Sequence, residues 1–394
     1  MRKSLLLVSV ILVLALLATS CGGQKATTSI RIGAVLELTG GLASLGNGVA
    51  NGAKIAVTEL NAKGGILGKT VELVVRDCKT DPVVAGTAAT ELIEVSKVTA
   101  MIGLVDSDLA LAVGPVCQKN GIPYMSSGAT SPKLPGQIGN TFFMSAFGDN
   151  TQAAAAAEYA YKELGARTAY VLWEKGIEYT TVLAKYFEQR WKELAGPDSV
   201  LLNDFYLQGD PKVSGQITKL RSLTKQPDVL FIASEPDDCG VVVKQFRDAG
   251  LNQPIFGGDA YDTPLLTQVA TGVSDVYYTA PSLLAENAGS EMGQKFYKEY
   301  VKTYGHAPES AFPALGYDSI MALAKAMEDA GSTDGAKVIA ALEKFKNVPA
   351  VAGNLTFGPN LNDHTPMKQV AIIRTVKGQL ELAAMYAPEK VPAP

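Results

Sequence analysis

Residues 102–130, IGLVDSDLALAVGPVCQKNGIPYMSSGAT, contain two short apolar runs that each end in small hydroxyl and glycine residues. The first run, 100–105, leads into Asp-Ser-Asp and then into the helical spacing of 109–119, and the second run, 122–125, leads into Ser-Ser-Gly-Ala-Thr. Strand, polar loop and helix in this order are typical of an open parallel α/β sheet, which binds ligands at the carboxyl ends of its strands. Backbone N–H groups at a helix start attract anions. We therefore expect this segment to hold the carboxylate and ammonium of a small ligand.

The same alternation of strands and helices runs through most of the chain and predicts two lobes. From residue 30 the order is β-α-β-α-β-α-β, and a second series of similar size occupies 150–257. Such units imply a parallel sheet with right-handed crossovers, and 394 residues exceed one ordinary core. We predict an α/β fold of two doubly wound parallel-sheet lobes joined by a hinge that the chain crosses several times.

The predicted lobes are discontinuous, because the chain returns to each of them. The first lobe is assigned residues 30–146 and 280–352, and the second is assigned 147–279 and 353–394. Residues 276–281 are expected to cross back to the first lobe. A third crossing is expected near 350–359, where proline and glycine interrupt the helical pattern. Residues 353–386 are expected to form hairpin-like strands.

The amino terminus resembles a bacterial lipoprotein signal. Arg2 and Lys3 precede an apolar run at 5–17, which is too short for a membrane span and typical of a signal-peptide core. Ala-Thr-Ser-Cys follows, with Ala18 where leucine is usual. We predict a signal peptide at 1–20 and a lipid-anchored linker at 21–29 beginning at a lipidated Cys21. Plain secretion, with Cys21 removed or free, is the alternative.

Composition and cysteine spacing exclude several classes of partner. A formal net charge of −4 argues against nucleic acid, which requires a basic face. Cys78 and Cys117 could pair outside the cytoplasm, but spacing alone does not define a disulfide. No CxxC pair or Cys/His cluster is present, so no metal site is expected.

Catalytic and nucleotide-binding motifs are also missing from the sequence. GGILGKT at 64–70 has three residues between its glycines where a phosphate-binding loop needs four, and it precedes a strand instead of following one. The two histidines, His306 and His364, lie far from any candidate nucleophile. We therefore expect a binding protein without a cofactor, and not an enzyme.

Acidic residues concentrate where strands are expected to end. They are Asp106, Asp108, Asp149, Glu235, Asp237, Asp238, Asp259 and Asp262. For Asp237, Asp238 and Asp262 we expect a solvated loop or a helix cap. Asp259 directly follows the apolar run PIFGG, so its carboxylate could pair with a ligand ammonium in a charge-assisted hydrogen bond. Tyr179, just after a predicted strand and loop, could form a wall of the cleft.

With these segments in view, the chain resembles the periplasmic substrate-binding proteins of branched-chain amino-acid ABC transporters, the leucine/isoleucine/valine-binding type. The resemblance covers residues 30–386 and rests on IGAVLELTG, NAKGGILGK, SSGATSP, GDN at 148–150 and GYDS at 316–319. It implies a type I periplasmic-binding fold, in which the two lobes close over a ligand. It also implies as partners a small-molecule ligand and the membrane permease and ATPase of an importer.

The resemblance also implies roles for particular residues. Ser107 and Thr130 match the hydroxyls that bind the ligand carboxylate, and the backbone of Gly128, with Ala129 beside it, matches the ammonium acceptor. From the second lobe, Tyr179 and Asp259 would close over the head group.

The end of the site that would hold the side chain departs from the family pattern. Leu45 and Glu235 occupy positions that are usually aromatic, Phe312 matches another aromatic, and Asp106 precedes the binding serine. Two acids beside an aliphatic ligand would be costly to desolvate, which favours an amino acid with a polar or cationic side chain. A polyamine or aromatic acid as ligand, and a ligand-sensing receptor module, are the alternatives. We expect a monomer, anchored at the periplasmic or cell-surface side of a membrane.

Overall fold

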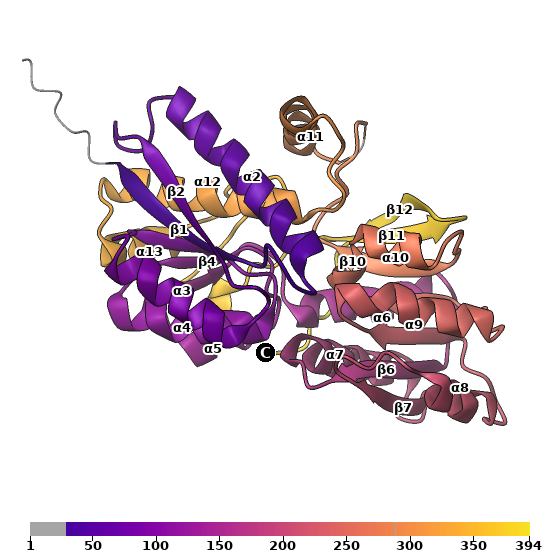
Figure 1. Cartoon of the computed structure of the whole chain (residues 1–394). Coiled ribbons are helices and arrows are strands. Elements are labelled where there is room, and N and C mark those ends of the chain that lie inside the picture. Colours follow the sequence, from indigo (N-terminus) through magenta and orange to yellow (C-terminus); the bar gives the residue numbers. More distant parts are fainter. Residues whose placement is uncertain (1–28, 288) are drawn as a thin grey trace, which may run out of the picture.

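The computed structural model describes residues 29–287 and 289–394, which form two lobes side by side (Figure 1). The predicted signal peptide and Cys21 lie outside the described residues. Among the described helices, none combines the length and the apolar character needed to cross a membrane.

The first lobe is built on a five-stranded parallel sheet with the order β2-β1-β3-β4-β5. Its strands are β1 (Ile30–Leu36), β2 (Val71–Asp77), β3 (Ala100–Gly103), β4 (Tyr124–Ser126) and β5 (Phe142–Met144). Its helices are α2 (Ala43–Ala62), α3 (Pro82–Glu94), α4 (Ser107–Asn120), α5 (Leu134–Ile138), α11 (Glu291–Tyr304), α12 (Phe312–Ala330) and α13 (Gly335–Leu342). Apolar residues of α2, α11, α12 and α13 share one core with the sheet, and those of α3, α4 and α5 share another. The sheet is therefore covered on both faces, as its nearly continuous apolar strands require.

The second lobe is built on a seven-stranded sheet with the order β12-β11-β10-β9-β8-β6-β7. Its strands are β6 (Ala169–Lys175), β7 (Val200–Leu207), β8 (Val229–Ala233), β9 (Ile255–Gly257), β10 (Val276–Ala280), β11 (Val370–Val376) and β12 (Gln379–Tyr386). Its helices are α6 (Asp149–Lys162), α7 (Glu178–Ala195), α8 (Ser214–Arg221), α9 (Pro236–Asp248) and α10 (Pro264–Val269). The first two pack in one core and the last three in the other. β6 to β10 pair in parallel, and β11 and β12 add an antiparallel hairpin at one edge.

Two expected crossings differ from the structure. Residues 276–281 were expected to return to the first lobe, but β10 lies inside the second sheet between β9 and β11. The last crossing lies later than the expected division after residue 352 and beyond the expected region 350–359, because His364 still stacks on Phe143 of β5 in the first lobe. At the first crossing, Ala146 belongs to the first core and Phe147 to the second. Cys78, Cys117 and Cys239 are all buried and unpaired, so Cys78 and Cys117 do not form the disulfide that spacing left open.

Helices α2 and α12 approach each other closely through glycines. A Cβ added to Gly52 would lie 1.7 Å from the backbone oxygen of Pro313, and one added to Gly316 would lie 2.1 Å from that of Val49. Neither position leaves room for any side chain, so the contact depends on glycine. This close packing places Leu45, near the start of α2, and Phe312, at the start of α12, at the edge of the sheet that faces the second lobe.

Candidate functional site

A small pocket lies between the lobes at the carboxyl ends of their strands. The first lobe lines it with Leu42, Leu45, Val105, Asp106, Thr130 and Phe312, and the second lines it with Tyr179, Glu235, Asp259 and Ala260. Seven of the ten residues that the sequence analysis proposed for the ligand site are among these. The free volume of about 10 Å³ is enough for about one water molecule. The lobes are therefore closed on each other, and a ligand enters only when they separate.

The other three proposed residues lie behind the pocket wall. Ser107 is fully buried, and its Oγ accepts a hydrogen bond from the backbone N–H of Ser131 at 3.2 Å. Ala129 packs into the core under α4. Gly128 is the closest of the three to the pocket, because a Cβ there would lie 3.0 Å from Cε1 of Phe312. Their direct contact with a ligand stays a prediction.

Direct contacts between the lobes surround the pocket. The backbone N–H of Glu178 donates to Oδ2 of Asp108 at 3.0 Å. Oδ2 of Asp262 accepts from the backbone N–H of Ala311 at 2.6 Å, at the start of α12. Asp262 was expected in a solvated loop or at a helix cap, but it is buried and bonds the backbone just before α12 of the other lobe.

The proposed ammonium partner, Asp259, belongs to a buried network that the sequence analysis did not identify. Nε2 of Gln152 donates to Oδ1 of Asp259 and to Oδ1 of Asp149, each at 2.8 Å. Oε1 of Gln152 accepts from the backbone N–H of Asp259 at 3.0 Å and from the hydroxyl of Thr279 at 2.5 Å. One amide therefore holds two carboxylates in place. Gln152 lies three residues after Asp149 on α6, and this helical spacing is the only sequence signal that could have pointed to it.

Tyr179 completes this side of the pocket. Its hydroxyl oxygen accepts a hydrogen bond from the backbone N–H of Ala260 at 3.2 Å. A Cβ on Gly258 would lie 2.3 Å from that hydroxyl, so the tyrosine requires glycine at this position. The hydroxyl of Tyr179 and the carboxylate of Asp259 thus lie side by side at the pocket, where both can face a ligand head group.

Acidic side chains line the pocket without a basic partner among the described residues. Burial raises the pKa of Asp259 to about 6 and that of Asp106 to about 7. Burial also raises the pKa of Glu235 and Asp149, and neighbouring carboxylates raise both further. No lysine or arginine among the described residues lines this pocket. The arrangement therefore favours a ligand that brings positive charge with it.

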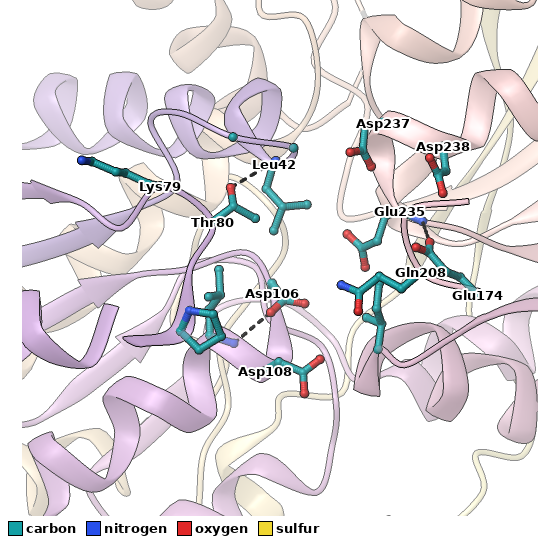
Figure 2. Close-up of a pocket in the computed structure, with 16 residues that line it drawn as sticks. Leu42, Lys79, Thr80, Asp106, Asp108, Glu174, Gln208, Glu235, Asp237 and Asp238 are labelled. Carbon is teal, nitrogen blue, oxygen red and sulfur yellow. Dashed lines mark hydrogen bonds between the residues drawn. The ribbon is translucent and has the colours of Figure 1, made fainter. Parts of the chain in front are cut away.

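A second, larger cavity of about 370 Å³ opens directly outside the pocket (Figure 2). Six carboxylate side chains line it: Asp106, Asp108, Glu174, Glu235, Asp237 and Asp238. We call this cavity the acidic chamber. The expected solvated setting fits Asp237, which is exposed, but not Asp238, which is buried, and both border the chamber. Among the described residues, no group of three or more potential ligands is arranged to hold a metal ion.

Raising the pH from 5 to 8 should lower the melting temperature of the ligand-free protein. The folded-state pKa values of Asp259, Asp106 and Asp262, about 6, 7 and 7, lie above the usual value of 3.8. The folded state therefore binds more protons than the unfolded state, and stability present at acid pH is lost as the pH rises through these values. Thermal denaturation at several pH values measures this. A melting temperature that rises steadily over the range would contradict it, and Asp106→Asn should flatten the fall.

Comparison with known proteins supports the two-lobed α/β fold described above. A family model described as periplasmic binding protein matches residues 29–379. The Leu/Ile/Val-binding protein BraC3 of Rhizobium johnstonii is 28% identical over 345 residues, which cover 87% of this chain and 91% of that protein.

Two solved structures are similar over nearly the whole fold. The branched-chain amino acid transporter substrate binding protein LivJ from Streptococcus pneumoniae, in complex with isoleucine, has a TM-score of 0.83 and 28% identity, covering 92% of this chain and 100% of that one. The leucine binding protein LivK from Thermotoga maritima has a TM-score of 0.82 and 29% identity, covering 91% and 99%.

These similarities confirm the predicted fold of two parallel-sheet lobes and the predicted resemblance to binding proteins of the leucine/isoleucine/valine type. They also confirm that the chain is a binding protein and not an enzyme, because its relatives are substrate-binding proteins. The chain belongs to the periplasmic binding protein family, with the type I fold of its branched-chain amino-acid members.

Proposed function

We propose that this protein captures an amino acid outside the cytoplasm and delivers it to the permease and ATPase of an ABC importer. The observation that carries this proposal is the position of Asp259 and Tyr179 on one lobe, opposite Thr130 on the other. A carboxylate and a tyrosine suit an α-ammonium, and a hydroxyl beside backbone N–H groups suits an α-carboxylate. The names of BraC3, LivJ and LivK support the same class of ligand.

The side chain of this amino acid is polar or cationic, and not purely aliphatic. Asp106 and Glu235 both line the pocket, and both are at least nine-tenths buried. Enclosing an aliphatic side chain against them would remove water from two carboxylates without offering them a partner. An aromatic acid is disfavoured for a related reason, because it would bring a further negative charge to this pocket and no ammonium for Asp259.

Ligand capture, as proposed, is coupled to movement of the two lobes. In the closed form the pocket retains almost no free volume, and contacts such as Asp262 with Ala311 join the lobes around it. Because this pocket has room for about one water molecule, the lobes must separate to admit an amino acid. The bound form would be somewhat more open than this one while the amino acid contacts both lobes.

A thermal-shift screen of the twenty standard amino acids, putrescine and benzoate tests this function. At saturating concentration at least one amino acid should raise the melting temperature by mass action, because it binds only the folded state. If benzoate or putrescine raises it and no amino acid does, the proposed head-group contacts are wrong.

We further propose that Cys21 carries a lipid that anchors the protein to a membrane. The basic residues Arg2 and Lys3, the apolar run that follows them and the small residues before Cys21 support this. Cys21→Ser should move the protein from the membrane fraction to the soluble fraction on cell fractionation. If the variant stays with the membranes as the unaltered protein does, Cys21 is not the anchor.

A further inference from the structure

We propose that the acidic chamber binds a second cationic group of the ligand, so that the ligand is a dibasic amino acid with its side-chain ammonium or guanidinium in the chamber. This inference rests on the proposed function, since it takes the head-group site as given. It adds a second subsite and commits to a class of side chain.

The first observation is a buried carboxylate atom without a partner. Oε1 of Glu235 has no hydrogen-bond partner, although Glu235 is only 8% exposed. The neighbouring Glu174 does have partners within the protein. Its Oε2 accepts hydrogen bonds from the hydroxyl of Tyr206 and from the backbone N–H of Glu235, each at 3.1 Å. Buried polar atoms in folded proteins nearly always have partners. The unpartnered oxygen of Glu235 is therefore a place for a donor that the protein itself does not provide.

The second observation is that the pocket and the chamber adjoin each other. Leu42, Asp106 and Glu235 line both of them. In Figure 2 Glu235 extends from the second lobe toward the first, on which Asp106 lies. Asp106 uses Oδ1 to accept from the backbone N–H of Leu109 at 2.8 Å. A side chain that leaves the head-group site would pass between these two carboxylates before it reaches the chamber.

The third observation is that the chamber has no internal counter-charge. Lys79 is the only basic residue among those that line it, and this lysine is exposed and points away from the carboxylates in Figure 2. Six carboxylates without a facing cation repel one another. Burial raises the pKa of Glu235 and of Asp238, and neighbouring carboxylates raise both values further. A ligand cation would relieve this repulsion and make charge-assisted hydrogen bonds. With about 370 Å³, the chamber can accept either an ammonium or the larger planar guanidinium.

Lysine and norleucine provide a matched pair of probes, because norleucine has a lysine-like aliphatic chain that ends in a methyl group in place of the charged amine. In calorimetric titrations of the full mature chain at pH 8, lysine, ornithine or arginine should bind at least about 30-fold more tightly than norleucine. Glu235→Gln should reduce this ratio to about threefold or less, because lysine loses a charged partner and norleucine no longer has to desolvate this carboxylate. Asp106→Asn should also reduce the ratio of the lysine affinity to the norleucine affinity. Asp248→Asn is the control, since Asp248 lies on α9 together with Asp237 and Asp238 but is exposed and pairs with Lys244.

Two outcomes would overturn the inference. One is that norleucine binds the unaltered protein as tightly as the best dibasic amino acid. The other is that Glu235→Gln and Asp106→Asn both fold, as judged by their melting curves, and both keep the original preference. Failure of the proposed function looks different, because then none of the twenty standard amino acids raises the melting temperature in the thermal-shift screen. Cadaverine, which lacks the carboxylate, separates the two subsites further, and it should bind much more weakly than lysine.

Discussion

Asp259→Ala is expected to weaken amino-acid binding by about 2–5 kcal/mol, because it leaves a buried ligand ammonium without its anionic partner. Asp259 is 2% exposed and is held by Nε2 of Gln152, so no other carboxylate can move freely into its place. Asp149, the nearest alternative, is held by the same amide. Calorimetric titration with the tightest-binding amino acid of the thermal-shift screen measures the loss.

The melting temperature of an Asp259 variant distinguishes a loss of binding from a loss of structure. Burial raises the pKa of Asp259 to about 6, so its ionised form is destabilising in the ligand-free protein at neutral pH. Asp259→Asn should therefore fold with an unchanged or higher melting temperature at pH 8 while binding weakly. A loss of less than about 0.5 kcal/mol in Asp259→Ala would mean that Asp259 does not contact the ammonium.

Gly52→Ala is expected to destabilise the protein by about 1–3 kcal/mol or more, because the new methyl group has no space between α2 and α12. Its Cβ would lie 1.7 Å from the backbone oxygen of Pro313 and 2.7 Å from the carbonyl carbon. Backbone atoms cannot rotate out of the way as a flexible side chain can, so the two helices would have to separate. Since Leu45 and Phe312 belong to these helices, ligand binding should weaken as well.

Gly215→Ala is the matched control for this substitution. Gly215 also lies in a helix, and a Cβ there meets no atom within 4 Å. Alanine is favoured over glycine in a helix, so this variant should be as stable as the parent or slightly more stable. Urea denaturation measures the free energy of unfolding of both variants. If the two variants have the same free energy of unfolding, the close contact of α2 with α12 does not contribute to stability.

The strands and helices were largely predictable because each signal is local. Apolar runs that end in polar loops indicated the strand ends. A local signal also marks the start of α3, because Asp is a favoured N-cap and Pro a favoured first helical residue, and Asp81 accepts from the backbone N–H groups of Val83 and Val84. The route of β10 was not predictable in this way. An apolar run of five residues is compatible with either sheet, and only the pairing with β9 and β11 decides between them.

The site residues were predictable to about the same extent as the strands and helices. Residues at strand ends, such as Asp106, Thr130 and Asp259, could be proposed because parallel sheets gather these ends at one edge. Gln152 was not proposed, because its only sequence signal is the helical spacing from Asp149, which is weak for a neutral amide inside an alanine-rich helix. The same holds for the environment of Asp262, which is buried and accepts a hydrogen bond from Ala311 of the other lobe.

The measurement that tests the central claim most directly is a titration of lysine against two analogues that each lack one half of the head group. One is the α-hydroxy acid, which lacks the α-ammonium, and the other is cadaverine, which lacks the carboxylate. If an amino acid is held by Thr130 on one lobe and by Tyr179 and Asp259 on the other, both analogues should bind at least about 30-fold more weakly than lysine. An analogue that binds as tightly as lysine would contradict the claim that this pocket recognises an amino acid.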